Sequence, residues 1–227
     1  MMAGSGAPRP FYQVWMDAVT KPRSETYSSM ASAPSATATT AFIWIVLVSL
    51  VELIVSALVS SATQKMMQQI SGLPQFNRGG LGFGLISIVC GVPLVVLVFA
   101  ALTGIVYLIA RAFGGTGTYG QLAYVFAAIW SPLALVSAVL SIFTVIPLVG
   151  LCVLVVSIAL FIYMLVLMVI ATGAVQRISG GGAAVSVIAP YAALCICAGL
   201  VVFVGLAALA PMIGNVFSSI NGSLPTP

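Results

Sequence analysis

Long apolar runs dominate this sequence and constrain its fold more than any motif does. The run at 41–60, AFIWIVLVSLVELIVSALVS, holds a single charged residue and is long enough to cross a bilayer, which takes about 20 apolar residues. Charged residues make up 4% of the 227 residues, whereas soluble domains contain about 25%. Because so few charges cannot cover a water-exposed surface, the chain is predicted to be an all-α integral membrane protein.

Five apolar runs are expected to span the membrane as helices. Their bounds are about 41–62, 81–110, 120–142, 147–172 and 183–210, within a transmembrane domain at 41–212. A cytoplasmic or interfacial segment, 1–40, precedes this domain, and a polar tail, 213–227, follows it. The polar residues 63–80 are expected to form a loop. The short connection near 143–147 leaves open a re-entrant hairpin in place of the third and fourth spans.

The Lys and Arg residues predict how the chain is oriented. With five spans, the N-terminal segment and the loops after the second and fourth spans lie on one side of the membrane. That side carries five basic residues and the other carries two, and short cytoplasmic loops are enriched in Lys and Arg. The N-terminus is therefore predicted to be cytoplasmic and the C-terminus to lie outside. The first group is Arg9, Lys21, Arg23, Arg111 and Arg177, and the second is Lys65 and Arg78.

The stretch FYQVWMDAVTKPRSETYSSM at 11–30 is unusually polar and aromatic for this chain. Phe11, Trp15 and Ala18 follow the spacing of one helix face, and Pro22 should end that helix because proline cannot continue it. A second short helix is expected to follow. Both helices are expected to lie in the cytoplasmic interface, anchored by Phe11, Trp15, Pro22 and Tyr27. The alternative is a partly disordered tail.

Glu52 is the one acidic residue inside any predicted span. A charge at the centre of a span costs about 2.5–3.5 kcal/mol, and each Leu, Ile, Val or Phe returns about 0.3–0.6 kcal/mol, so the span still inserts. Ser49, Glu52, Ser56 and Ser60 recur every three or four residues and form a polar stripe on one helix face. Such a stripe is expected to face protein instead of lipid. It is either a structural or partner contact, or an ion or proton site.

Several kinds of chemistry find no residues here. The chain has no histidine, the commonest general base and transition-metal ligand, and it shows no paired acids and no nucleophile beside a base. Its glycine-rich turns lack the Lys-Ser/Thr ending of a phosphate loop. The four cysteines lie in apolar runs and are expected to be free, buried hydrophobic residues. The sequence therefore predicts no enzyme, no cofactor, no metal site and no nucleic-acid partner.

Three further stretches form a recognisable set: the entry segment Lys21-Pro22-Arg23-Ser24-Glu25-Thr26-Tyr27, the glycine-rich turn FGGTGTYGQL at 113–122, and the aromatic-to-proline stretch at 124–132. Together they resemble prokaryotic members of the Yip (Ypt-interacting protein) domain family. The resemblance implies five spans and a non-enzymatic membrane scaffold or adaptor in the bacterial cytoplasmic (inner) membrane. The Asp-Leu-Tyr-Gly-Pro signature of the eukaryotic members is absent, which argues against a role with small GTPases.

Two functions remain open after these observations. The first is a non-enzymatic scaffold or accessory subunit, packed laterally against other subunits of a larger membrane assembly, such as an energy-converting or trafficking complex. The alternative is a small transporter or channel component with Glu52 as its intramembrane ion or proton site. The lipid bilayer is a partner in both.

Overall fold

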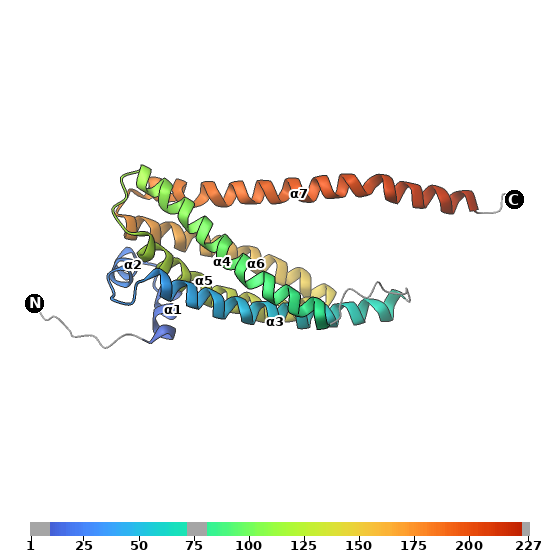
Figure 1. Cartoon of the computed structure of the whole chain (residues 1–227), viewed down its shortest axis with the longest axis horizontal. Helices are drawn as coiled ribbons and strands as arrows, with labels where there is room; N and C mark the ends of the chain where they lie inside the picture. Colours follow the sequence, from blue (N-terminus) through green and yellow to red (C-terminus); the bar gives the residue numbers. More distant parts are fainter. Residues whose placement is uncertain (1–9, 72–80, 224–227) are drawn as a thin grey trace, which may run out of the picture. The chain divides into compact units, whose positions relative to one another are not determined.

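The computed structural model describes residues 10–71 and 81–223, and every regular element in these residues is a helix. Two short helices precede five long ones (Figure 1). A single 3-10 turn, η1 (Phe143–Val145), joins the third and fourth long helices. The helices are α1 (Phe11–Thr20), α2 (Ser24–Ala31), α3 (Ala38–Ser71), α4 (Leu81–Ala112), α5 (Tyr119–Ile142), α6 (Pro147–Gln176) and α7 (Gly180–Ser223).

Five of the described helices are long and apolar enough to cross a membrane, as predicted. The candidate spans are Ala38–Thr63, Ile88–Ala112, Tyr119–Val145, Leu148–Gln176 and Gly180–Ala207. The connection near 143–147 is a turn between two full-length helices, and Pro147 occupies the first turn of α6, where a missing N–H costs nothing. The third and fourth spans are therefore separate helices, each long and apolar enough to cross a membrane.

Two helices extend further than expected from the sequence. α3 continues to Ser71, through residues expected to begin a loop at 63, because Gln, Lys and Met are good helix formers and nothing there ends the helix. α7 continues through Pro211 to Ser223, into the expected polar tail. The change from apolar to polar residues marks where the chain leaves the hydrocarbon core. The end of a helix depends instead on capping residues and backbone conformation, so the helix can continue past the end of the span.

Helix α5 forms the centre of the bundle. It contacts α1, α2, α3, α4 and α6, and every residue from 122 to 129 is buried. Half of its span is buried inside the protein, compared with 11–17% for the other four spans. Its start is fixed by a capping box, in which Thr118 accepts from the Gln121 N–H and the Gln121 side chain accepts from the Thr118 N–H.

The chain divides into two units, Met1–Ile188 and Ala189–Pro227. The opening turns of α7 belong to the first unit, where Ala183, Ser186 and Val187 are buried. In the second unit, every residue from 192 to 207 is exposed, which suits a helix surrounded by lipid. All four cysteines are free and exposed on helix surfaces, contrary to the expectation that they are buried.

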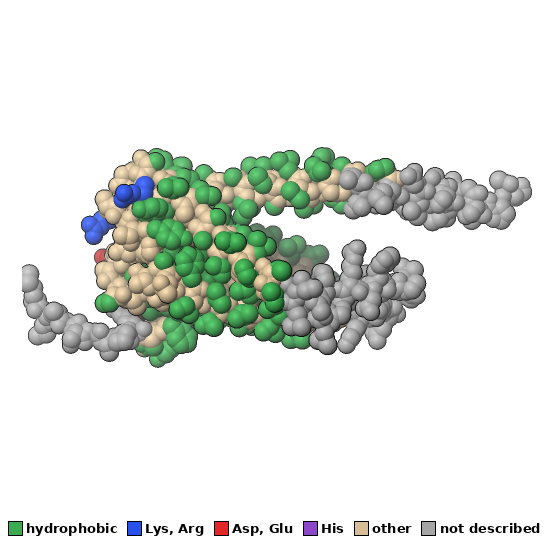
Figure 2. All heavy atoms as spheres, viewed as in Figure 1, with side chains coloured by type: hydrophobic (Ala, Val, Ile, Leu, Met, Phe, Trp, Pro, Cys, Tyr) green, Lys and Arg blue, Asp and Glu red, His purple; other side chains and the backbone are tan. Residues whose placement is uncertain are grey.

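The basic residues of the first unit whose side chains are described lie at one end of the bundle. Lys21 and Arg23 are in the short connection between α1 and α2, Arg111 is in the last turn of α4, and Arg177 directly follows α6. Figure 2 shows the Lys and Arg side chains gathered at this end and hydrophobic side chains covering the flanks of the bundle. We call this the basic end of the bundle.

Candidate functional site

The most extensive helix contact in the bundle is between α3 and α5, which run parallel from the basic end. At its start, a Cβ added to Gly120 would lie 3.3 Å from the Ala38 nitrogen and 3.9 Å from the Ala38 Cβ. Further along both helices, the rings of Trp44 and Tyr124 are 4.9 Å apart. Small residues allow this close approach, as they do between helices in membranes generally.

Two buried serines occupy corresponding positions in α3 and α5. Ser49 and Ser131 each lie eleven residues after the contact between Ala38 and Gly120, and eleven residues return a side chain to within about 20° of its starting direction. Both residues are fully buried, and neither Oγ has a hydrogen-bond partner among the described residues. Pro132, directly after Ser131, has no N–H. The Ala128 carbonyl therefore lacks the donor that an α-helix would normally supply.

The remaining residues of the predicted stripe continue the same face of α3. Glu52 lies one turn beyond Ser49 and is half-buried, whereas Ser56 and Ser60 are exposed. The chain thus covers the stripe at Ser49 and leaves it increasingly open beyond Glu52. We call Glu52, Ser56 and Ser60 the open polar face of α3.

The open polar face places polar side chains at the depth of the hydrocarbon core, where exposure to lipid is unfavourable. Glu52 is near the middle of the span Ala38–Thr63, and its neighbours Val51 and Ile54 are 44% and 49% exposed. Ionisable side chains at this depth are rare and normally contact protein or a water-filled cavity. Among the described residues, no three His, Cys, Asp or Glu side chains group as metal ligands. The face can donate and accept hydrogen bonds to another helix.

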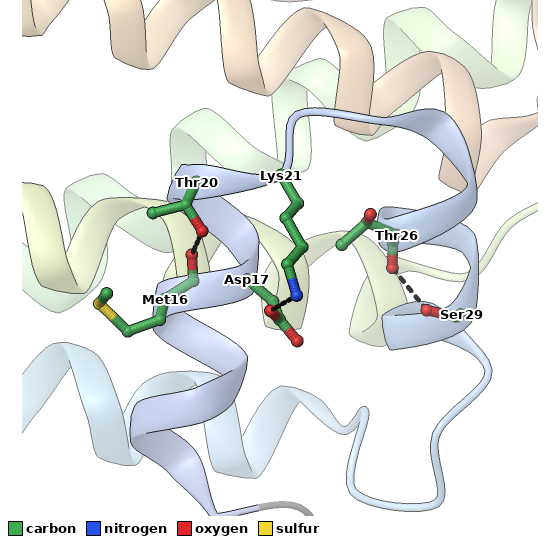
Figure 3. Close-up of polar contacts among 6 residues, drawn as sticks. All are labelled: Met16, Asp17, Thr20, Lys21, Thr26 and Ser29. Atoms are coloured by element: carbon green, nitrogen blue, oxygen red, sulfur yellow. Dashed lines mark hydrogen bonds and ion pairs between the residues drawn. The ribbon is translucent and has the colours of Figure 1, made fainter.

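The opening stretch folds as two short helices separated at Pro22, as the sequence indicates. Pro22 lies between them, outside both helices. Figure 3 shows how α1 ends: Lys21 Nζ lies 2.8 Å from Asp17 Oδ1, and Thr20 Oγ1 donates to the Met16 carbonyl at 2.6 Å. These local contacts stabilise the last turn of α1 before the chain turns into α2.

The predicted interfacial anchors are placed in different ways. Phe11 is 56% exposed. Trp15 is partly covered, with its ring 5.3 Å from Phe11 and 5.8 Å from Trp44 of α3. Tyr27 is fully buried, so its ring contacts protein and not lipid headgroups. The hairpin of α1 and α2 is thereby packed on the bundle.

Two tyrosine hydroxyls hold the carboxyl end of α1. Tyr27 Oη donates to the Ala18 carbonyl at 2.7 Å, and Tyr163 Oη of α6 donates to the Val19 carbonyl at 2.6 Å. Both acceptors belong to the last turn of α1, whose carbonyls have no partner within the helix. Burial, and secondarily the neighbouring Tyr163, raise the pKa of the Tyr27 phenol. Tyr27 therefore stays neutral and keeps its donor.

The glycine-rich turn at 113–118 joins the ends of α4, α5 and α6. Gly114 has φ of +87°, which favours glycine. Arg111 Nη1 donates to the Gly115 carbonyl at 3.3 Å, and the Thr116 N–H donates to the Gln176 carbonyl at 3.0 Å. These features agree with a tight turn and explain the glycines without a phosphate ligand.

Two contributors were not singled out from the sequence as site residues. Ser131 was noted only within the aromatic-to-proline stretch, although a serine directly before an intramembrane proline is a recognisable polar signal. No sequence signal linked Tyr163 to α1, because its acceptor, Val19, lies 144 residues away in the sequence. Such a pairing follows from tertiary packing alone.

The comparisons with known proteins agree with this architecture. No characterised protein and no solved structure matches the sequence. The Yip1 domain family matches residues 16–203, a range that begins within α1, includes α3 to α6 and ends within the fifth span. Five apolar helices, a short helical entry segment and this match over most of the chain place the protein in the Yip1 domain family.

Proposed function

We propose that this protein is a non-enzymatic membrane scaffold or accessory subunit that binds other membrane proteins laterally through the open polar face of α3. The observation that supports it is the position of Glu52, half-buried in mid-span with Ser56 and Ser60 exposed beyond it. A buried hydrogen-bonding group without a partner costs about 1–3 kcal/mol. Covering this face with a helix that carries hydroxyl or amide groups removes that cost.

The proposal includes an orientation. The described basic residues at the basic end, Lys21, Arg23, Arg111 and Arg177, support a cytoplasmic location for that end by the enrichment of Lys and Arg in cytoplasmic loops. We place the protein in the bacterial cytoplasmic membrane, with α1 and α2 on the cytoplasmic side. The partner then meets α3 within the bilayer and not at the aqueous surface.

The buried serines favour a second candidate function. Ser49, one turn from Glu52, and Ser131 of the neighbouring α5 both have buried hydroxyls without partners in the described part of the chain, which could serve as oxygen ligands for a proton or monovalent cation. This is the small-transporter alternative, in which Glu52 exchanges a proton or balances the charge of an ion. It predicts a different ranking of variants from the scaffold proposal.

Two substitutions at Glu52 test the scaffold proposal. Glu52→Gln retains hydrogen-bonding atoms of similar shape, so its assemblies on a native gel in mild detergent should match those of the wild type. Glu52→Leu removes them, and a loss of about 1–3 kcal/mol should weaken assembly roughly 5- to 150-fold. Leu47→Ala, at an exposed apolar position of α3, is the matched control and should assemble normally.

Flux measurements in vesicles separate the two functions. The scaffold proposal expects no proton or sodium flux from the wild type. The transporter alternative expects flux that is lost equally in Glu52→Gln and Glu52→Leu, because neither side chain can release a proton. Such flux, with assembly unchanged in both variants, would overturn the scaffold proposal.

A further inference from the structure

Helix α1 presents large apolar side chains away from the bundle. Phe11, Tyr12 and Met16 are 56%, 55% and 60% exposed, while Val14 and Ala18, on the adjoining side of the helix, are 6% and 0% exposed. At about 100° per residue, the exposed apolar residues share one arc of roughly 140° with the partly covered Trp15 and Val19. The polar residues of α1 follow outside this arc: Gln13, Asp17 and Thr20.

The attachment of α1 to the bundle is specific. Hydroxyls of Tyr27 and Tyr163 bind two carbonyls of its last turn, at 2.7 Å and 2.6 Å. The rings of Trp15 and Trp44 meet edge to face. α1 therefore has a defined position beside α5, and its exposed arc is held in one direction relative to the spans.

Lipid is the occupant that fits this arc. α1 has ten residues, about 15 Å in length, which is too short to span. It lies near the basic end, and basic side chains of this kind suit the depth of lipid headgroups. Ile43 and Leu47, on the basic-end half of α3, are also exposed apolar residues of a span. Short amphipathic helices of this type insert at the boundary between headgroups and acyl chains.

We propose that the hairpin of α1 and α2 acts as a fixed wedge in one leaflet. The protein then favours membranes that are convex on the side of that leaflet. A helix lying at headgroup depth adds cross-section to one leaflet, and its binding depends on curvature. Because α1 is attached to the spans, the added area stays beside them. At the opposite end, the described connection from α5 to α6 is only the turn Phe143–Val145. This inference is independent of the open polar face of α3.

The experiment measures sorting of the purified full-length protein, labelled at its N-terminus, between giant vesicles and membrane tethers pulled from them. A membrane-impermeant quencher identifies the molecules whose N-terminus faces outward. For these molecules, the density in the tether should exceed the density in the flat membrane by about two-fold or more. Molecules of the opposite orientation should be depleted.

Two triple variants decide the result. Replacing Phe11, Tyr12 and Met16 by Asn should abolish the enrichment, and the fold should persist because these side chains are mostly exposed. The matched control replaces Phe143, Ile146 and Leu148 by Asn; these positions are 50%, 54% and 83% exposed at the opposite end, and enrichment should remain. Equal densities for the wild type, or unchanged enrichment in the first variant, would overturn the proposal. If the first variant loses its enrichment in the tether but still assembles normally on native gels, the loss comes from the wedge and not from a failure of the proposed scaffold function.

Discussion

Gly117→Ala should be among the most damaging single-methyl additions in the bundle. A Cβ at Gly117 would lie 2.5 Å from the Val175 carbonyl oxygen and 3.1 Å from its carbon. Both atoms are backbone, so no side-chain rotation can relieve the contact. Ordinary van der Waals contact begins at 3.4 Å, so the turn and the end of α6 must separate by about 0.9 Å, the difference between these distances.

The expected cost follows from what that separation disturbs. Overpacking of a well-packed site costs about 1–3 kcal/mol. The movement also strains the neighbouring hydrogen bond from the Thr116 N–H to the Gln176 carbonyl, 3.0 Å long, and such a bond contributes about 1 kcal/mol. We therefore expect the free energy of unfolding of Gly117→Ala to fall by about 2–4 kcal/mol.

The measurement is equilibrium unfolding of the purified protein in mixed micelles, with increasing denaturing detergent and tryptophan fluorescence as the signal. Gly104→Ala is the matched control, because an added Cβ there meets nothing within 4 Å inside α4. Replacing a helical glycine by alanine should stabilise the protein by about 0.5–1 kcal/mol. Variants that unfold at the same detergent fraction, or a Gly117→Ala protein as stable as the wild type, would refute the reasoning.

Three further predictions concern the N-terminal hairpin and the topology. Tyr27→Phe and Tyr163→Phe should each lower the free energy of unfolding by about 1 kcal/mol, because each leaves a carbonyl of α1 without its donor; near-neutral effects by the same unfolding assay would argue against docking through these hydroxyls. Because the pKa of Tyr27 is raised in the folded protein, its contribution to stability should be complete below about pH 10 and decline above it. Tyr27→Phe should flatten that decline in an alkaline unfolding series. Cysteines introduced at Ser5 and Thr226, in a background without the native cysteines, should be labelled from opposite sides of the membrane, and labelling of both from one side would contradict an odd number of spans.

The spans and the local breaks were predictable, because they depend on short stretches of sequence. The number of spans followed from apolar length, and the division of the opening stretch at Pro22 followed from the backbone of proline. The tight turn at 113–118 followed from its glycines. Each of these features arises within about 30 neighbouring residues, where steric and hydropathic rules act directly.

The pairing of the helices was not predictable in the same way. In a lipid environment an apolar side chain gains little by facing protein, so apolar periodicity does not show which face of a span is covered. Only Ser49 and Glu52 indicated the inner face of α3, and nothing indicated α5 as its neighbour. The burial of Tyr27 was missed for a related reason: an aromatic ring near a membrane surface suits a lipid anchor and a buried donor equally well.

The parallel pairing of α3 with α5 has a consequence for how the protein is made. Ser131 is synthesised about 80 residues after Ser49, which takes roughly 4–16 s at 5–20 residues per second. During that interval α3 has inserted without α5, the helix that covers Ser49, and among the described residues α4 is the one long helix between α3 and α5 in the chain. The span inserts on its own apolar residues, but until α5 arrives its polar side chains are best covered by another polar surface, such as the insertion machinery or a partner already in the membrane. Assembly with a partner could then begin during translation, before the central helix has left the ribosome.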